Sequence, residues 1–161
     1  MKKTLFVAAA AAAFIASPVL AKDFSGPRVE LTAGVDDVKN GVDPTDIVYG
    51  GAIGYDMQLG KVVIGVEATA ANVFDRADFG AGARLGVKTN ENVLVYGRVG
   101  YTNLERLPVR GAKVTLDGVT LGGGIEALIA GPVYGKIEYR YTDFSGAVAR
   151  HGALLGVGYR F

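Results

Sequence analysis

Eight stretches of this chain alternate apolar residues with small or polar ones at a period of two. In the last stretch, HGALLGVGYRF, one side carries Leu155, Val157, Tyr159 and Phe161, and the other carries mostly glycine with Arg160. Successive side chains of a β-strand point to opposite faces, so each stretch predicts a strand with one apolar face and one face of glycine and charge. The eight stretches span residues 28–36, 47–57, 62–70, 79–88, 93–101, 119–127, 133–142 and 151–161.

The lengths of these strands and of their connections indicate a membrane-crossing meander. The strands run about nine to eleven residues, which is the length of a tilted strand that crosses a bilayer. Short turns are expected at 58–60, 89–92 and 129–132, and longer polar loops at 37–46, 71–78 and 103–118, with a shorter one near 143–150. We therefore predict an all-β fold, an eight-stranded antiparallel up-and-down transmembrane β-barrel with both termini at the short-turn end.

The first 21 residues resemble a secretory signal. A basic start at Lys2 and Lys3 precedes an apolar run that ends before Ser17-Pro18, and small residues lead to a cleavage site after Ala21. We predict a cleaved signal peptide at 1–21 and a single β-barrel domain at 22–161. Removing the signal changes the net charge from +1 to −1. The mature chain therefore lacks the excess of positive charge that binding to nucleic-acid phosphates requires. The absence of cysteine excludes a disulfide-held fold.

Periodicity alone does not say which face is outside, because a soluble eight-stranded barrel would bury the apolar face. Three features favour the opposite arrangement, in which the apolar face is outside. The charged face is rich in glycine, which suits a narrow interior, and a lipid-facing barrel must leave no open edge. The aromatic residues of the apolar face also gather near strand ends, as interfacial girdles do. One girdle comprises Tyr55, Tyr159 and Phe161, and the other Tyr49, Phe79, Tyr101 and Tyr141.

The order of the last two strands, IEYRYTDF and then LLGVGYRF, is similar to that of opacity-type and OmpA-like small barrels of Gram-negative bacteria, which belong to the porin-type outer-membrane β-barrels. In that family the C-terminal pattern of Leu155, Val157, Tyr159 and Phe161 is a signal that the barrel-assembly machinery recognises. The resemblance implies a location in the outer membrane with both termini in the periplasm. It also explains a final strand that runs to Phe161, because that strand must close the barrel against the first one.

The inward face is expected to carry four acids and four bases in a space that side chains alone fill. Buried charges must be paired, so we expect a lumen plugged by ion pairs, with Arg84 next to a carboxylate such as Glu67. An alternative is a gated ion path, in which the pairs exchange partners around a thread of water. The expected lumen network consists of Glu30, Glu67, Arg84, Arg98, Glu126, Lys136, Glu138 and Arg140.

Other chemistry has weaker support in the sequence. The lipid A deacylases of this size carry a His-x-Ser pair, whereas the chain has His151-Gly152-Ala153, and Ser145 has no evident acid partner, so we expect no enzyme. We expect no cofactor or metal, because there is one histidine and no cysteine. A calcium site in the first long loop is disfavoured by the spacing of its acids, which are Asp36, Asp37, Asp43 and Asp46.

The predicted function is structural: a plugged, monomeric barrel that contributes to envelope integrity. A narrow, low-conductance pore for ions or small solutes is the alternative, and adhesion through the surface loops comes third. The expected partners are outer-membrane lipids, lipopolysaccharide and, during insertion, the assembly machinery. Bases in the longest loop suit lipopolysaccharide phosphates, and the candidates are Arg106, Arg110 and Lys113.

Overall fold

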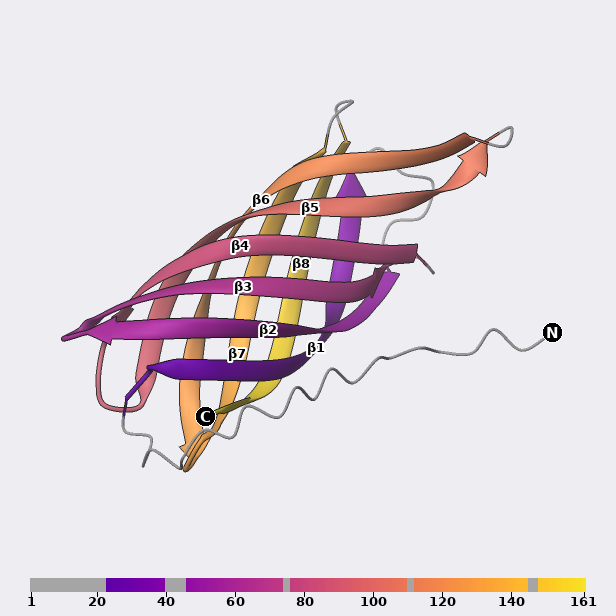
Figure 1. Ribbon diagram of the computed structural model, residues 1–161. Coiled ribbons are helices and arrows are strands. Elements are labelled where there is room, and N and C mark those ends of the chain that lie inside the picture. The colour runs from indigo at the N-terminus through magenta and orange to yellow at the C-terminus, as the bar shows by residue number, and fades with distance from the viewer. Residues whose placement is uncertain (1–22, 40–45, 74–75, 110–111, 145–147) are drawn as a thin grey trace.

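The computed structural model describes residues 23–39, 46–73, 76–109, 112–144 and 148–161, which form eight antiparallel strands in one closed barrel (Figure 1). The predicted fold class is confirmed. No helix in these ranges is long and apolar enough to cross a membrane. The strands are β1 (Gly26–Lys39), β2 (Asp46–Leu59), β3 (Val62–Val73), β4 (Arg76–Lys88), β5 (Val93–Val109), β6 (Ala112–Ala130), β7 (Val133–Phe144) and β8 (Val148–Arg160).

The last strand closes the barrel on the first. β8 pairs with β1 in a continuous register from Arg28 opposite Arg160 to Lys39 opposite Ala149. The pairing continues to the final residue, because the Phe161 N–H donates a 2.9 Å hydrogen bond to the Pro27 carbonyl. Every strand therefore has a hydrogen-bonded neighbour on both sides, which a barrel in hydrocarbon requires.

The connections at the end that holds both Gly26 and Phe161 are short, as predicted. Gly60 and Gly131 occupy two of these turns with φ values of +65° and +54°, a left-handed conformation that glycine adopts at low cost. In the turn between β4 and β5, the Thr89 N–H donates to the Val93 carbonyl.

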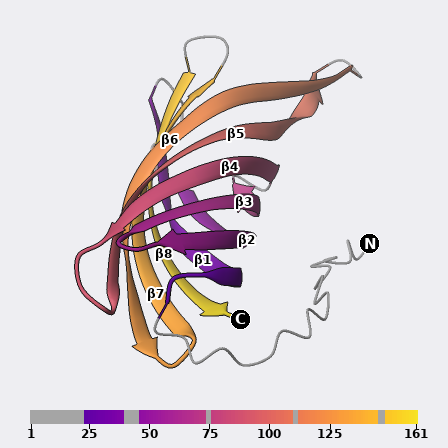
Figure 2. The ribbon, with the colours of Figure 1, turned by 60° about the vertical axis from the view of Figure 1, so that its left-hand side comes forward.

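The opposite end differs from the prediction of long loops. Strands continue through most of the residues assigned to loops, and the largest change is at 103–118, where β5 and β6 stay paired as far as Val109 and Ala112. Figures 1 and 2 show these two strands reaching beyond their neighbours. A two-stranded ribbon that extends beyond the end of the barrel has no lipid-facing side. Its residues therefore need no alternation of apolar and polar side chains, and the sequence shows no period of two there.

The outer surface of the barrel is apolar and the interior is charged. Leu31, Ile47 and Ile137 are each more than 60% exposed, whereas Arg28 and Glu30 on β1 and Glu138 on β7 are buried. This arrangement excludes the soluble-barrel alternative, in which the apolar face would be buried. The aromatic residues assigned to the two girdles lie on this outer face, with Tyr141 only partly exposed.

Candidate functional site

The barrel interior is the candidate site, and glycines shape it. Asp56 on β2, Gly65 on β3 and Arg84 on β4 lie in one row across three paired strands. A Cβ on Gly65 would collide with the Asp56 carboxylate and come within 3.2 Å of Arg84 Cγ. The missing side chain therefore lets Arg84 reach across β3 to Asp56. Gly158 does the same for the ring of Tyr134, which occupies the space that a Cβ there would need.

Asp56 is fully buried, accepts hydrogen bonds from two arginines and forms an ion pair with a third. Arg84 donates two hydrogen bonds to it, with Nε 2.9 Å from Oδ1 and Nη2 2.5 Å from Oδ2. Arg160 Nη1 lies 2.6 Å and Arg28 Nε 3.2 Å from Oδ2. Arg84 and Arg160 also share Glu126, at 2.9 Å and 2.6 Å. The three arginines therefore gather around one carboxylate, and two of them are tied to a second.

Glu138 on β7 is a second centre of the same kind. It accepts from Tyr96 Oη at 2.5 Å, from Lys136 Nζ at 3.1 Å and from Arg98 Nη1 at 3.3 Å, and it pairs with Arg140. Two links join it to the first centre. Arg98 forms an ion pair with Glu67, which also pairs with Arg28. Lys136 forms an ion pair with Glu30, which likewise pairs with Arg28.

These contacts form one connected network. Among the described residues, five carboxylates and six cationic side chains are joined by twelve ion pairs. Every member except Arg140 has a side chain no more than 4% exposed. In so dry a space each charge depends on its partners, because an unpaired buried charge costs several kcal/mol. The members are Arg28, Glu30, Asp56, Glu67, Arg84, Arg98, Glu126, Lys136, Glu138, Arg140 and Arg160.

Aromatic and apolar side chains fill the end near the termini. Phe24, just before β1, is fully buried against Val63, Leu94 and Tyr96, with Leu128 beside them. Its backbone is also held, since its N–H donates to Gln58 at 2.8 Å and its carbonyl accepts from Arg160 at 3.1 Å. This end of the lumen is therefore closed by a side chain from outside the sheet.

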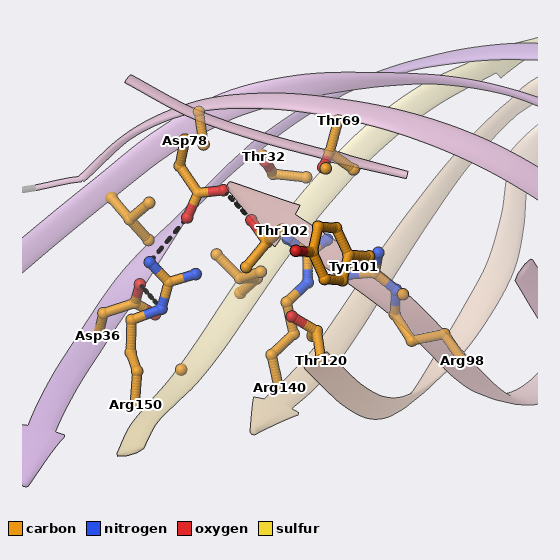
Figure 3. Close-up of a pocket in the computed structure, with 16 residues that line it drawn as sticks. Thr32, Asp36, Thr69, Asp78, Arg98, Tyr101, Thr102, Thr120, Arg140 and Arg150 are labelled. Atoms are coloured by element: carbon orange, nitrogen blue, oxygen red, sulfur yellow. Dashed lines mark hydrogen bonds and ion pairs between the residues drawn. The ribbon is translucent and has the colours of Figure 1, made fainter. Parts of the chain in front are cut away.

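A small cavity lies at the other end of the network (Figure 3). Its volume is about 30 Å³, room for a few water molecules at most. Arg150 on β8 lines this cavity and spans the lumen, 2.8 Å from Asp78 on β4 and 3.4 Å from Asp36 on β1. Thr102 donates to Asp78, and Arg140 also lines the cavity.

All eight residues assigned to the lumen from the sequence lie inside the barrel, and each takes part in an ion pair. The expected pairing of Arg84 with Glu67 is wrong. Arg84 faces Gly65 in the register and reaches Asp56 and Glu126 instead, while Glu67 pairs with Arg28 and Arg98.

The predicted lumen network lacked several interior residues. Arg28, Asp56, Arg160, Tyr96 and Tyr134 were visible on the polar face of their strands, and the alternation alone places them inside. Phe24 precedes the first strand and carries no periodic signal.

The other candidate residues have different locations. Leu155, Val157, Tyr159 and Phe161 point outward, and the Tyr159 and Phe161 rings meet edge to face at 4.8 Å. Arg106 and Lys113 belong to the paired β5–β6 ribbon rather than to a loop. Outside the described residues lie Arg110, Ser145, Asp43 and the proposed signal peptide.

Asp36 and Asp37 do not converge, because Asp36 faces the lumen and Asp37 faces outward. Asp46 begins β2. His151 is on the outer face, and its ring nitrogen Nδ1 is hydrogen-bonded to Tyr139 rather than to a serine.

Comparison with known sequences gives consistent matches. Residues 6–161 match a family described as "Outer membrane protein beta-barrel domain". A 22 kDa outer membrane protein of Rhizobium leguminosarum bv. viciae is 30% identical over 143 residues, covering 70% of this chain. The 25 kDa outer-membrane immunogenic protein of Brucella ovis is 26% identical over 136 residues, covering 74% of this chain. The chain spans about two thirds of the length of these relatives, 66% in both cases.

Solved structures share the fold. Neisserial surface protein A superimposes with a TM-score of 0.60 at 17% identity, covering 85% of this chain and 98% of that protein. The attachment invasion locus protein of Yersinia pestis gives a TM-score of 0.58 at 17% identity, with coverages of 85% and 99%. At this level of identity the likeness concerns the fold alone.

Proposed function

Because the chain belongs to the outer membrane protein beta-barrel domain family, we propose that it acts as a structural barrel of the outer membrane, with a lumen closed by ion pairs, and that it contributes to envelope integrity. In this role the protein forms a rigid, impermeable cylinder in the membrane, and its apolar outer face contacts the surrounding lipids. Both termini lie in the periplasm, so the β5–β6 ribbon lies on the cell surface.

The connected charge network carries this proposal. Each carboxylate of the network is bonded to at least two cations, and Asp56 and Glu138 each have three. Moving one of these carboxylates to open a path would break two or three buried ion pairs at once, and each charge that loses a partner is then less well compensated for its burial. The fully buried Phe24 adds a second closure at the periplasmic end.

A narrow pore is the second candidate function, and one observation favours it. Arg140 is the most exposed member of the network, has Glu138 as its only ion-pair partner among the described residues, and borders the cavity. It is the side chain best placed to change partners. Adhesion through the surface ribbon is the third candidate.

The partners that we propose are outer-membrane lipids, lipopolysaccharide through Arg106, Arg110 and Lys113, and the assembly machinery through Leu155, Val157, Tyr159 and Phe161. The barrel works as a monomer, without a cofactor and without catalysis.

Deletion of the gene tests the envelope role. We expect the deletion strain to become sensitive to detergents and to large antibiotics that an intact outer membrane excludes, and a plasmid copy to restore resistance. Unchanged detergent sensitivity would refute this role. In that case, slower uptake of small solutes would support the pore, and reduced attachment to surfaces would support adhesion.

A further inference from the structure

The only histidine of the chain lies on the membrane-facing surface. His151 belongs to β8, whose other outward residues in this part of the strand are Ala153, Leu155 and Val157. An ionisable side chain on the lipid side of a membrane protein is rare, and where it occurs it points to a functional site with a partner. Nothing in the lumen network involves this residue.

Three polar side chains surround His151 on the same outer face. In the register, Asp37 of β1 lies opposite it on one side and Tyr141 of β7 on the other. Side chains opposite one another in paired strands have Cβ atoms about 5 Å apart. The Tyr141 ring lies 5.0 Å from the imidazole, and the Tyr139 hydroxyl lies 2.5 Å from Nδ1. We call Asp37, Tyr139, Tyr141 and His151 the rim cluster.

The rim cluster lies just inside the outer boundary of the apolar band. His151 is eight residues from Tyr159 of the periplasmic girdle, which corresponds to about 26 Å along the strand. With a strand tilt of about 40°, this spans roughly 20 Å of the apolar band, whose full height is about 25 Å. His151 therefore lies close to the outer boundary of that band, beside the aromatic residues of the outer girdle.

We propose that the rim cluster binds the sugar ring of an outer-leaflet glycolipid, of the phosphorylated disaccharide class to which lipid A belongs. Nδ1 is bonded to Tyr139, whereas no residue of the described ranges forms a hydrogen bond with Nε2. A sugar hydroxyl donates and accepts, so it matches Nε2 in either tautomer. Asp37 accepts a second hydroxyl, and the exposed face of Tyr139 packs against the sugar.

The negative charge of Asp37 favours a sugar ring over a bare phosphate as the ligand of the rim cluster. Phosphate oxygens only accept hydrogen bonds, and the Asp37 carboxylate repels them. A sugar ring is neutral where it meets Asp37, and its phosphate groups can lie away from the cluster. The proposal rests on the proposed orientation, because only then does the rim cluster face the leaflet that contains glycolipid.

The single histidine also makes the test direct. Protein without a histidine tag, labelled with ¹³C,¹⁵N-histidine and placed in phosphatidylcholine nanodiscs, gives imidazole NMR signals from His151 alone. We expect these signals to shift saturably as lipid A is added, and to shift much less with phosphatidylethanolamine at the same mole fraction. Both nanodisc leaflets carry the added lipid, so the outcome does not depend on how the protein is oriented in cells or on whether its lumen is closed.

Two variants keep the histidine probe in place. Tyr139→Phe removes the hydrogen bond that holds the imidazole, and Asp37→Ala removes the acceptor for the second hydroxyl. Each should weaken the apparent affinity about fivefold, the effect of one lost hydrogen bond. Tyr55→Phe, the same change in the periplasmic girdle, should titrate like the wild type, and heat-modifiable gel mobility checks folding of all three. The absence of a saturable shift with lipid A, an equal response to phosphatidylethanolamine, or wild-type affinity in both rim variants would overturn the proposal.

Discussion

Replacing Asp56 with asparagine tests the energetics of the lumen network at one of the two carboxylates that pair with three cations. Asp56 receives four nitrogen–oxygen contacts of 3.2 Å or less from three arginines. Asparagine has nearly the same shape but no charge, and its amide nitrogen would face an arginine donor. Removing one partner from a buried ionic cluster costs about 3–5 kcal/mol. We therefore expect Asp56→Asn to lower the free energy of unfolding by about that amount.

Urea titration of the refolded protein in phospholipid vesicles measures this change. Asp143→Asn is the matched control, because Asp143 is exposed on the outer side of β7, and its effect should stay within about 0.5 kcal/mol. If Asp56→Asn were no more destabilising than the control, water would already solvate the lumen charges, as in an open pore. That result would refute the reasoning.

Three further variants test other parts of the account. Phe24→Ala should lower the unfolding free energy in the same titration by about 3–5 kcal/mol, because it empties a fully buried site, and a loss below about 1 kcal/mol would contradict a closing role. Gly158→Ala should cost about 1–3 kcal/mol because its Cβ would collide with the Tyr134 ring, whereas Gly97→Ala, whose Cβ meets nothing closer than 3.8 Å, should be nearly neutral; equal effects would be evidence against the glycine packing. Phe161→Ala should reduce the amount of heat-modifiable barrel in outer-membrane fractions, and normal levels would argue against an assembly signal.

The sequence was sufficient for the barrel because lipid imposes a strict rule on every strand. Each outward residue from Val29 to Val35 and from Leu155 to Tyr159 had to be apolar or small, so the period of two was visible without any structure. Outside the membrane, outward residues do not have to be apolar, so the period of two disappears. The paired ribbon from Asn103 to Asp117 is held by backbone hydrogen bonds and was mistaken for a loop.

The sequence predicted which side chains face the lumen, but not which ion pairs they form. Alternation places Arg84 and Glu67 on the inward face. The partner of Arg84, however, depends on the space above Gly65 and on the reach of a long side chain across the neighbouring strand. Both the space at Gly65 and the reach of Arg84 depend on residues that are far apart in the sequence. Phe24 was missed for a related reason, since its burial depends on the mouth of a barrel that forms from residues far along the chain.

Single-channel recording tests the closed lumen most directly. The refolded protein is inserted into a planar bilayer, its insertion is verified by heat-modifiable gel mobility, and current is recorded across a range of voltages. The account predicts a silent membrane, because the charge network and Phe24 both obstruct the lumen. Discrete, reproducible current steps from the wild-type protein would contradict it and would make the narrow pore the leading function.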